Sequence, residues 1–418
     1  MAFDRPGRVR PAMTGTAGAR LARVRRFCAT LGPGLLVMIA DSDPGNVATA
    51  AQCGGVWGYR LLPLLLLLIP PLYFVQELAV RLGVFSGRGF GELVRQEFGL
   101  RWAAPCAAAL VLAALGTLVT AFAAVAGIGE VHGLSRPVSL AGAAALLAVA
   151  RIGGSYRRIE RVALAIGAFE AAFFVVAWQA RPDVALIMRE AADVPLRSPQ
   201  FGYLAAAVVG ASFSPWMTFY QQSAIVARGI GPADYRAARW DTAAGAALTQ
   251  CLTAAVLIAA ATTLRDSGPL ASLGDIVEAF SNAEPHISPF VFDMGVLGAA
   301  LVAVIVASLA LTWGLGEIFG GSARDLSGGG WVSAAFAVTV CGSAVLVGFT
   351  PDLVSLTVAA QAANVILSPV VVTLLIILAG RVLPERLRLR GRERAIVVAS
   401  AATTMAIGVA GGLLALFS

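Results

Sequence analysis

The chain has 418 residues, of which 58% are hydrophobic and only 13% are charged, and its formal net charge is +7. Apolar runs recur along nearly the whole length, which indicates a polytopic membrane protein rather than a soluble domain with one core. All 31 basic residues are arginine, and they show no interleaving with aromatic residues that would favour nucleic acid. The five cysteines are widely spaced and there are only two histidines, so neither a disulfide framework nor a zinc site is expected.

The N-terminal segment is strongly basic, with seven arginines among the first 26 residues. A basic segment before an apolar run is also the order found in a signal peptide, but no small-residue cleavage pattern follows the first apolar run. We therefore interpret residues 1–30 as a solvated cytoplasmic tail.

A helix needs about 20 residues to cross the hydrocarbon core of a bilayer. On that basis the sequence predicts about eleven membrane-spanning helices in an all-α integral membrane protein. They are expected at residues 32–55, 61–82, 103–129, 137–152, 160–180, 203–228, 240–264, 289–318, 331–349, 353–380 and 396–417. The connections at 181–200 and 265–288 are polar and contain proline, and no soluble domain is expected.

The distribution of arginine predicts the orientation in the membrane. A cytoplasmic N-terminus places 25 of the 31 arginines on the cytoplasmic side, including those of a linker at 381–395. Such an asymmetry follows the positive-inside rule. We therefore expect a bacterial inner (cytoplasmic) membrane protein with Ser418 on the outer side. The six arginines outside would be Arg60, Arg136, Arg181, Arg189, Arg197 and Arg265.

The first predicted helix is interrupted by Asp-Ser-Asp-Pro-Gly-Asn at residues 41–46. Pro44 lacks an amide hydrogen and the glycine after it is flexible, so carbonyls from Ala40 to Asp43 lose their helical partners. With the Asp43 carboxylate and the Asn46 side-chain oxygen, these carbonyls can converge on a hard cation such as Mg²⁺, Ca²⁺ or Mn²⁺. The alternative is a proline kink in which the acidic residue only caps the restarted helix.

The sixth predicted helix has a comparable break at residues 210–215. Pro215 frees the carbonyl of Ala211 for the same reason, and Ser214 and Met217 flank the proline. The alternative is a kink satisfied by serine hydroxyls and neighbouring helices, as is common in membranes.

Breaks that lie five helices apart predict an inverted repeat, with the site between the two broken helices. We expect a transporter core at 31–380, with one repeat at about 31–181 and the other at about 201–380. An additional membrane helix is expected at 396–418.

Other polar groups occur in apolar segments. Gln361, in the tenth predicted helix, can supply a further oxygen ligand or bond to a neighbouring helix. Five carboxylates are expected mostly near helix ends or paired with arginine, namely Glu77, Glu170, Asp241, Asp293 and Glu317.

The segment from Gly32 to Tyr59 resembles the first-helix signature of NRAMP-type divalent metal transporters, most specifically in Asp43-Pro-Gly-Asn46. The likeness continues after the second helix, in Arg-Leu-Gly-Val-Phe-Ser-Gly at 81–87. This resemblance implies a leucine-transporter-like fold with broken helices 1 and 6. It also implies metal binding by Asp43, by Asn46, by the Ala211 carbonyl and by Gln361.

The sixth helix departs from that family pattern. Ser214 and Trp216 replace the methionine and histidine of members that carry Mn or Fe, although Met217 can compensate if the helix restarts with another rotation. The third helix has no carboxylate at 120–124, where proton-coupled members carry two. These departures resemble the magnesium-transporting branch, which is uncoupled. Asp41 is an extra carboxylate that can raise ion affinity or take a proton from its neighbour.

The sequence therefore predicts a carrier of divalent cations, Mg²⁺ or Mn²⁺/Fe²⁺, that works by alternating access, with Mg²⁺ favoured by the local substitutions. A sodium-coupled carrier of an organic solute is the alternative on the same fold. An intramembrane enzyme is disfavoured because the motifs of metalloproteases and serine hydrolases are absent. Beyond the cation as substrate and the lipid bilayer, we expect no cofactor, no nucleic acid and no obligate protein partner.

Overall fold

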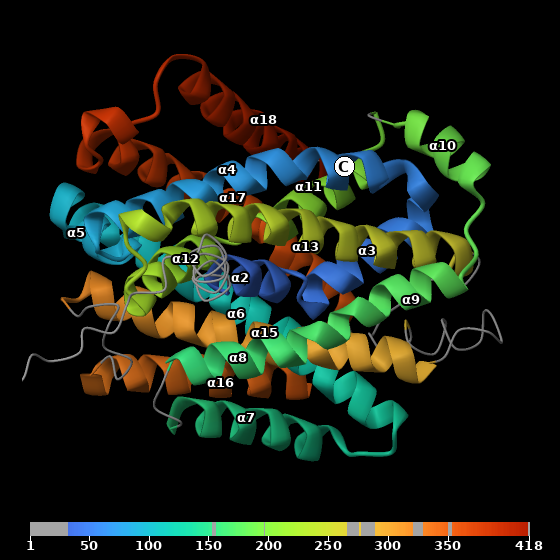
Figure 1. Cartoon of the computed structure of the whole chain (residues 1–418). Helices are drawn as coiled ribbons and strands as arrows, with labels where there is room; N and C mark the ends of the chain where they lie inside the picture. Colours follow the sequence, from blue (N-terminus) through green and yellow to red (C-terminus); the bar gives the residue numbers. More distant parts are fainter. Residues whose placement is uncertain are drawn as a thin grey trace, which may run out of the picture.

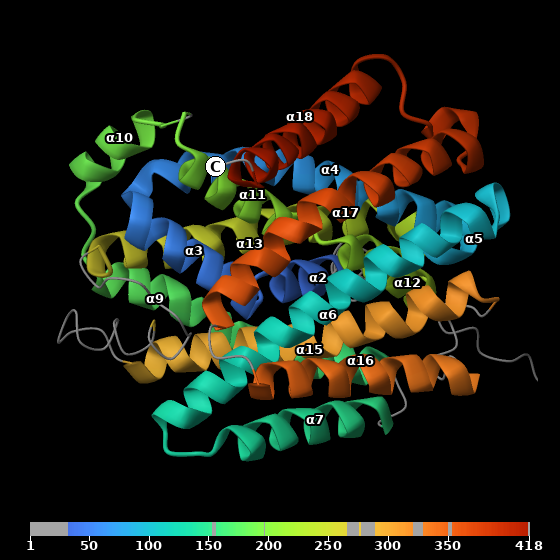
Figure 2. The ribbon, with the colours of Figure 1, turned by 180° about the vertical axis from the view of Figure 1, so that it is seen from behind.

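The computed structural model describes residues 32–152, 156–195, 197–265, 276, 289–320, 329–349 and 353–416. The tail predicted at 1–30, most of the 265–288 connection and Ser418 lie outside these residues. Within them the chain is almost entirely helical and contains no strand. Figures 1 and 2 show long helices running side by side, with α2 and α3 in the middle of the bundle.

The helices occur in chain order where the eleven spans were predicted. The first span is two helices, α2 (Pro33–Asp41) and α3 (Pro44–Trp57), and the sixth is α11 (Pro199–Ser212) and α12 (Pro215–Arg228). The others are α4 (Leu62–Ser86), α6 (Leu100–Val131), α7 (Arg136–Ile152), α8 (Tyr156–Gly167) with α9 (Ala172–Gln179), α13 (Tyr235–Thr263), α15 (Pro289–Ile318), α16 (Gly329–Phe349), α17 (Leu353–Val382) and α18 (Gly391–Leu416).

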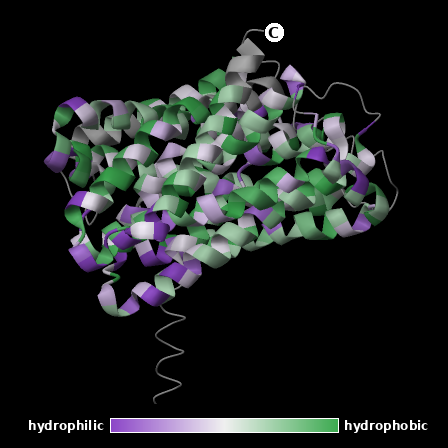
Figure 3. Ribbon diagram, turned by 90° about the horizontal axis from the view of Figure 1, so that it is seen from above, coloured by the Kyte–Doolittle hydropathy of each residue, from purple (hydrophilic) through white to green (hydrophobic). Residues whose placement is uncertain are grey.

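By length and hydropathy alone, seven stretches of the described chain can cross a membrane. α7, which coincides with the shortest predicted span, is not among them, and neither are the two 14-residue halves of the sixth span. In Figure 3 hydrophobic residues dominate the middle of the helices, whereas hydrophilic residues gather towards their ends. Helices of this kind leave only their ends in contact with water.

Two short helices in the connections were not predicted. α5 (Phe90–Phe98) follows α4, and α10 (Val184–Ala192) follows α9. α5 is held by a carboxylate from a distant helix, because Glu317 of α15 accepts a hydrogen bond from the Gly91 amide at 3.0 Å. α10 is held by its own carboxylate, because Glu190 accepts a hydrogen bond from the distant Tyr59 amide at 3.0 Å. Because the bonded residues are more than 100 positions apart in the sequence, no local pattern predicts these two helices.

Both ends of the broken helices are fastened to their surroundings. At the arginine-rich end, Asp241 of α13 accepts hydrogen bonds from the amides of Gly32 (3.0 Å) and Gly34 (2.7 Å), where α2 begins. Arg228, at the end of α12, pairs with Glu160 of α8 at 2.6 Å.

At the opposite end of the bundle, Glu190 pairs with Arg265 at 2.6 Å. The hydrogen bond from Arg265 lowers the pKa of this carboxyl below its ordinary value. Because the same carboxylate accepts from the Tyr59 amide, it ties α10 to the segment that follows α3.

Candidate functional site

The first break begins where α2 ends at Asp41. Asp43 is extended (φ −63°, ψ 166°) and caps α3, because its Oδ1 accepts from the Asn46 amide at 2.8 Å. The Asn46 Nδ2 donates back to the carbonyl of Asp41 at 3.1 Å. The carbonyl of Ala40 lies four residues before Pro44, so it has no helical donor. All five residues are buried.

The second break repeats this construction. α11 ends at Ser212, and Ser214 is the extended residue (φ −68°, ψ 130°) before Pro215 at the start of α12. The Ala211 carbonyl lies four residues before that proline and so also lacks a helical donor. Like Ala40, Ala211 ends a half-helix whose C-terminus carries partial negative charge, which favours a cation. The residue four positions before each proline therefore presents a free oxygen at a helix end.

A chain of hydrogen bonds joins the two breaks through α17. The Gln361 Nε2 donates to Asp43 Oδ1 at 3.2 Å, and its Oε1 accepts from Asn364 Nδ2 at 2.9 Å. The same Asn364 nitrogen donates to the Ser214 hydroxyl at 3.1 Å. One turn further along α17, Ser368 donates to the carbonyl of Phe213. The residues at the N-cap positions of the two restarted helices, Asp43 and Ser214, are thus connected by two carboxamides on one helix face.

This close approach depends on glycine. A Cβ atom on Gly45 would overlap the Gln361 amide nitrogen, and one on Gly210 would overlap the Gln361 carbonyl oxygen. α17 therefore touches both breaks at the same residue only because neither position has a side chain.

Two further continuous helices close the site. On α6, Thr117 lies beside the Asp43 carboxylate and accepts a hydrogen bond from Trp216 Nε1 at 3.0 Å. On α13, Thr249 bonds to Ser42 at 2.9 Å, and its neighbour Gln250 donates to Ser212 at 2.9 Å. Each unwound segment is therefore held by hydroxyl or carboxamide groups.

Three carboxyl groups, those of Asp41, Asp43 and Glu170, lie close together around the breaks. Asp41 and Glu170 are 2% and 1% exposed, and none of their carboxylate oxygens has a hydrogen-bond partner in the described part of the chain. Glu170 lies in η2 (Ala168–Ala171), between α8 and α9, close enough to Asp41 and Asp43 for their charges to interact. Buried charge without a partner is costly in a membrane, and a bound cation would offset it.

Glu170 thus differs from the expectation for the five carboxylates, because it lies within a spanning segment and is not paired with arginine. The other four carboxylates agree with the expectation, because each lies near a helix end or pairs with an arginine. Glu77 pairs with Arg81, Asp293 pairs with His132 instead of an arginine, and Asp241 and Glu317 accept backbone amides at the starts of α2 and α5.

No group of three or more His, Cys, Asp or Glu is placed to hold a metal ion among the residues that the structure describes. A cation at the breaks would therefore be bound by one carboxylate together with neutral oxygens, a donor set of the kind that suits hard ions. The carboxamide of Gln361 can present its oxygen instead of its nitrogen after a 180° turn about its last bond.

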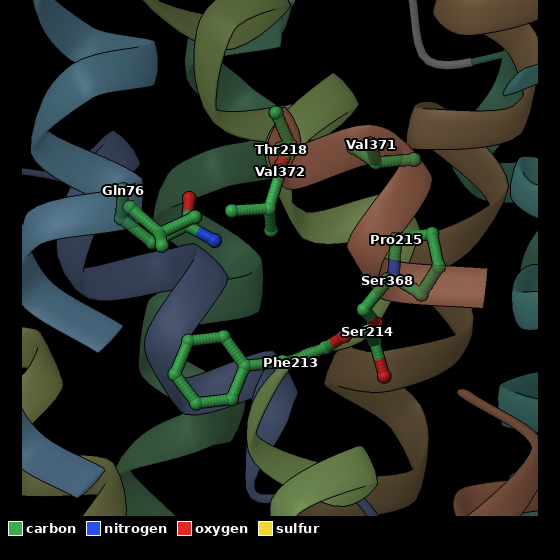
Figure 4. A pocket seen from close by; sticks show the side chains of 9 residues that line it. Gln76, Phe213, Ser214, Pro215, Thr218, Ser368, Val371 and Val372 are labelled. Atoms are coloured by element: carbon green, nitrogen blue, oxygen red, sulfur yellow. Dashed lines mark hydrogen bonds between the residues drawn. The ribbon is translucent and has the colours of Figure 1, made fainter. Parts of the chain in front are cut away.

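A small pocket of about 10 Å³, which is room for about one water molecule, adjoins the second break. Figure 4 shows Gln76 of α4 on one side of it, with Ser214, Pro215 and Ser368 on the other. The Oε1 of Gln76 is buried and has no hydrogen-bond partner among the residues that the structure describes. Ser214 therefore belongs to the hydrogen-bonded chain between the breaks and also lines the small pocket beside them.

The structure brings together most of the residues expected from the sequence. Asp43, Asn46, Ser214 and Gln361 belong to one hydrogen-bonded group, and Ala40 and Ala211 present free carbonyls at the same breaks. Met217 is fully buried in the first turn of α12, beyond the proline, and its amide bonds to the Ser214 carbonyl at 3.1 Å.

Asn364, Thr117 and Ser368 were missed, although a signal existed. Gln361, Asn364 and Ser368 are spaced by three and four residues and so share one face of an apolar helix.

Comparisons with known proteins agree with this geometry. Residues 34–414 match the family described as natural resistance-associated macrophage protein-like, Nramp. The chain is 30% identical over 315 residues to the divalent metal cation transporter MntH 1 of Pseudomonas aeruginosa, covering 69% of each chain. It is 29% identical to the divalent metal cation transporter MntH of Deinococcus radiodurans, covering 71% of this chain and 70% of the relative.

Solved structures show the same fold. A mutant of the Eremococcus coleocola manganese transporter superposes with a TM-score of 0.70 at 15% identity, covering 94% of each chain. MhsT in complex with L-phenylalanine superposes with a TM-score of 0.59 at 12% identity, covering 91% of this chain and 98% of MhsT. At these identities the likeness concerns the fold alone, and it confirms the predicted leucine-transporter-like architecture.

Proposed function

This chain belongs to the Nramp family, and from that premise we propose that it carries divalent metal cations across the cytoplasmic membrane by alternating access. The observation that carries the proposal is the chain of hydrogen bonds from Asp43 through Gln361 and Asn364 to Ser214, which joins the two unwound segments in a buried anionic region. The names of the relatives, which are divalent metal cation transporters, support the same class of substrate.

In this proposal Asp43 supplies charge and one direct ligand. Asn46, the Ala211 carbonyl and Gln361 supply neutral oxygens, and Ser214 binds directly or through water. The carbonyl of Ala40 is a further oxygen from the first break, and Asp41 and Glu170 add negative potential that favours a cation. Each of the neutral donors replaces part of the hydration shell that the ion loses on entering.

Alternating access requires that the two ends of the bundle open in turn. The contacts of Asp241 and Arg228 close one end around α2 and α12, and the Glu190–Arg265 pair closes the other near α3. Each group joins a broken helix or its flanking segment to a continuous helix. Opening one end therefore breaks a few ion pairs and amide contacts while the other set holds. The arginine asymmetry supports a cytoplasmic N-terminus, so that the end with Asp241 and Arg228 faces the cytoplasm.

We propose Mg²⁺ as the favoured ion, without coupled proton movement. Ser214 offers a hydroxyl where a thioether would retain softer metals, and it lines a pocket with room for about one water. Mg²⁺ usually keeps several of its waters, and one of them can lie in this pocket beside Gln76, Ser214 and Ser368. On α6 the residues beside the first break are Thr117 and Thr120, which carry no proton at neutral pH that they can release.

Uptake into proteoliposomes, with Mg²⁺, Mn²⁺, Ca²⁺ and Cd²⁺ in competition, tests this selectivity. We expect Ser214→Met to shift the preference towards Mn²⁺ and Cd²⁺ by about tenfold, equivalent to about 1.4 kcal/mol of differential binding. Ser400→Met, a half-buried serine on α18 away from the breaks, is the matched control and should leave the order of preference unchanged. An internal pH probe should report no acidification during uptake.

An unchanged order of ion preference in Ser214→Met would show that residue 214 does not determine the selectivity between ions. Acidification that depends on the metal would overturn the uncoupled mechanism while leaving the cation site intact.

A further inference from the structure

A second cavity lies far from the breaks, where α17 ends and α18 begins. Its volume is about 450 Å³, within the range of ligand-binding pockets in proteins. Figure 2 shows this corner, with the chain leaving the end of α17 near α5 and returning along α18. The transport site makes no use of it.

The cavity is lined by four arginines, Arg381, Arg388, Arg390 and Arg394, and by no acidic residue of the described chain. The nearest carboxylates are engaged elsewhere or exposed to water. Glu393 pairs with Arg81 at 2.7 Å, and Glu385 pairs with Arg390 at 3.3 Å but is 80% exposed, so that this pair adds little. The cavity is therefore strongly cationic.

Its remaining wall is apolar and continuous with the membrane-spanning part of α17. Ile376, Ile377 and Leu389 line the cavity, and the two isoleucines lie within the candidate span Asn364–Val382. Ile377 is 40% exposed, although it lies in a spanning segment. The cavity thus has an apolar side at the depth of the bilayer and a cationic side just beyond it.

Hydrogen bonds and a stacking contact hold the backbone around the cavity in place, and they leave one arginine side chain of the cavity unpaired within the described chain. Arg388 donates to the Leu383 carbonyl at 2.8 Å, Arg81 donates to the Leu387 carbonyl at 3.0 Å, and Arg381 stacks over Phe98 of α5 at 4.8 Å. Arg394, by contrast, has no side-chain partner in the part of the chain that the structure describes. A rigid backbone that presents an unpaired guanidinium group can bind an anion from outside the protein.

We propose that this cavity binds an anionic phospholipid, with the headgroup phosphate at Arg390 and Arg394 and an acyl chain along Ile376 and Ile377. A phosphate dissolved in water would need only the arginines, whereas the apolar wall at membrane depth fits a ligand that carries a hydrocarbon chain. Basic pockets between membrane helices bind anionic headgroups in this way. The inference does not depend on which ion the protein transports.

The test measures lipid bound to the full-length protein by native mass spectrometry, with phosphatidylglycerol and phosphatidylcholine offered in equal amounts. We expect the unmodified chain to retain phosphatidylglycerol selectively. Arg390→Gln together with Arg394→Gln should weaken that binding at least about tenfold, since each arginine near an anionic headgroup is worth roughly a further fivefold.

The matched control is Arg386→Gln together with Arg392→Gln, which removes the same charge from the same corner at positions outside the cavity. This control should keep at least half of the selective binding. Equal losses in the two double variants would overturn the proposal in favour of unspecific attraction. Equal retention of phosphatidylcholine, or displacement of the lipid by millimolar inorganic phosphate, would overturn it as well.

Discussion

Asp43→Asn should reduce metal uptake into proteoliposomes to the background of empty vesicles. The substitution removes the negative charge but leaves a side-chain oxygen that can still cap α3 at the Asn46 amide, because asparagine is as good a cap as aspartate. We expect the affinity for metal to fall by at least about 100-fold, since even the outer partners of metal ligands are worth about 10–100-fold. Asp43→Ala should lose uptake too, with about 1 kcal/mol of further stability lost with the cap.

Asp193→Asn is the control for this experiment. Asp193 is 70% exposed and pairs with Arg60 at 3.0 Å away from the breaks, so its loss should leave uptake near that of the unmodified chain. Substantial uptake by Asp43→Asn, at the same ion concentration, would show that the carboxylate is a cap and not a ligand.

Gly210→Ala should destabilise the protein and abolish uptake together. The added methyl group would overlap the backbone oxygen of Gln361, which cannot move away as a flexible side chain does, so α11 and α17 must separate. Overpacking of this kind costs about 1–3 kcal/mol or more. The separation would also draw Gln361 and Asn364 away from Asp43 and Ser214. Thermal unfolding and uptake of the same preparation measure both effects.

Gly142→Ala provides the comparison, because it makes the same change in a helix where a Cβ meets nothing within 4 Å. Alanine is favoured over glycine within helices by about 0.5–1 kcal/mol, so this variant should be at least as stable as the unmodified chain. If Gly210→Ala melted and transported like Gly142→Ala, the close contact of α17 with the second break would be irrelevant to function.

The breaks could be predicted from the sequence because proline acts locally. Pro44 and Pro215 each remove a donor, and α2, α3, α11 and α12 have the predicted break points. Because Pro70, Pro105 and Pro369 lie inside continuous helices, proline indicated a break only together with the small and polar residues beside it. Apolar length located the helices as well, although only seven stretches of the described chain are long and apolar enough to cross a membrane. Asp43 and Asn46 were identified by their position beside the first proline, which needs no knowledge of the tertiary structure.

What the sequence did not predict depends on long-range packing. Gln361 was named from the sequence as a candidate ligand, but its contact with both breaks, 318 residues from Asp43, was not predicted because it depends on two distant glycines. Glu170 resembled a carboxylate near a helix end, but the 3₁₀ turn η2 lies within a spanning segment and buries it near Asp41. The short helices α5 and α10 are each held by a hydrogen bond between a carboxylate and a backbone amide more than 100 residues apart.

Three continuous helices thus position the candidate site, and the two broken helices supply its backbone oxygen atoms. α6, α13 and α17 contribute threonine, glutamine and asparagine side chains that hold the unwound segments at a fixed separation. In the proposed mechanism, this frame allows a cation to be bound between the breaks and then released when one end opens.

Anomalous X-ray diffraction from crystals of the full-length protein soaked in Mn²⁺ is the most direct test of the central claim. Manganese serves as a detectable divalent ion even if Mg²⁺ is the favoured substrate. We expect one strong anomalous peak within bonding distance of the Asp43 carboxylate and the Ala211 carbonyl, between the two breaks. A peak at another carboxylate, with none between the breaks, would contradict the account.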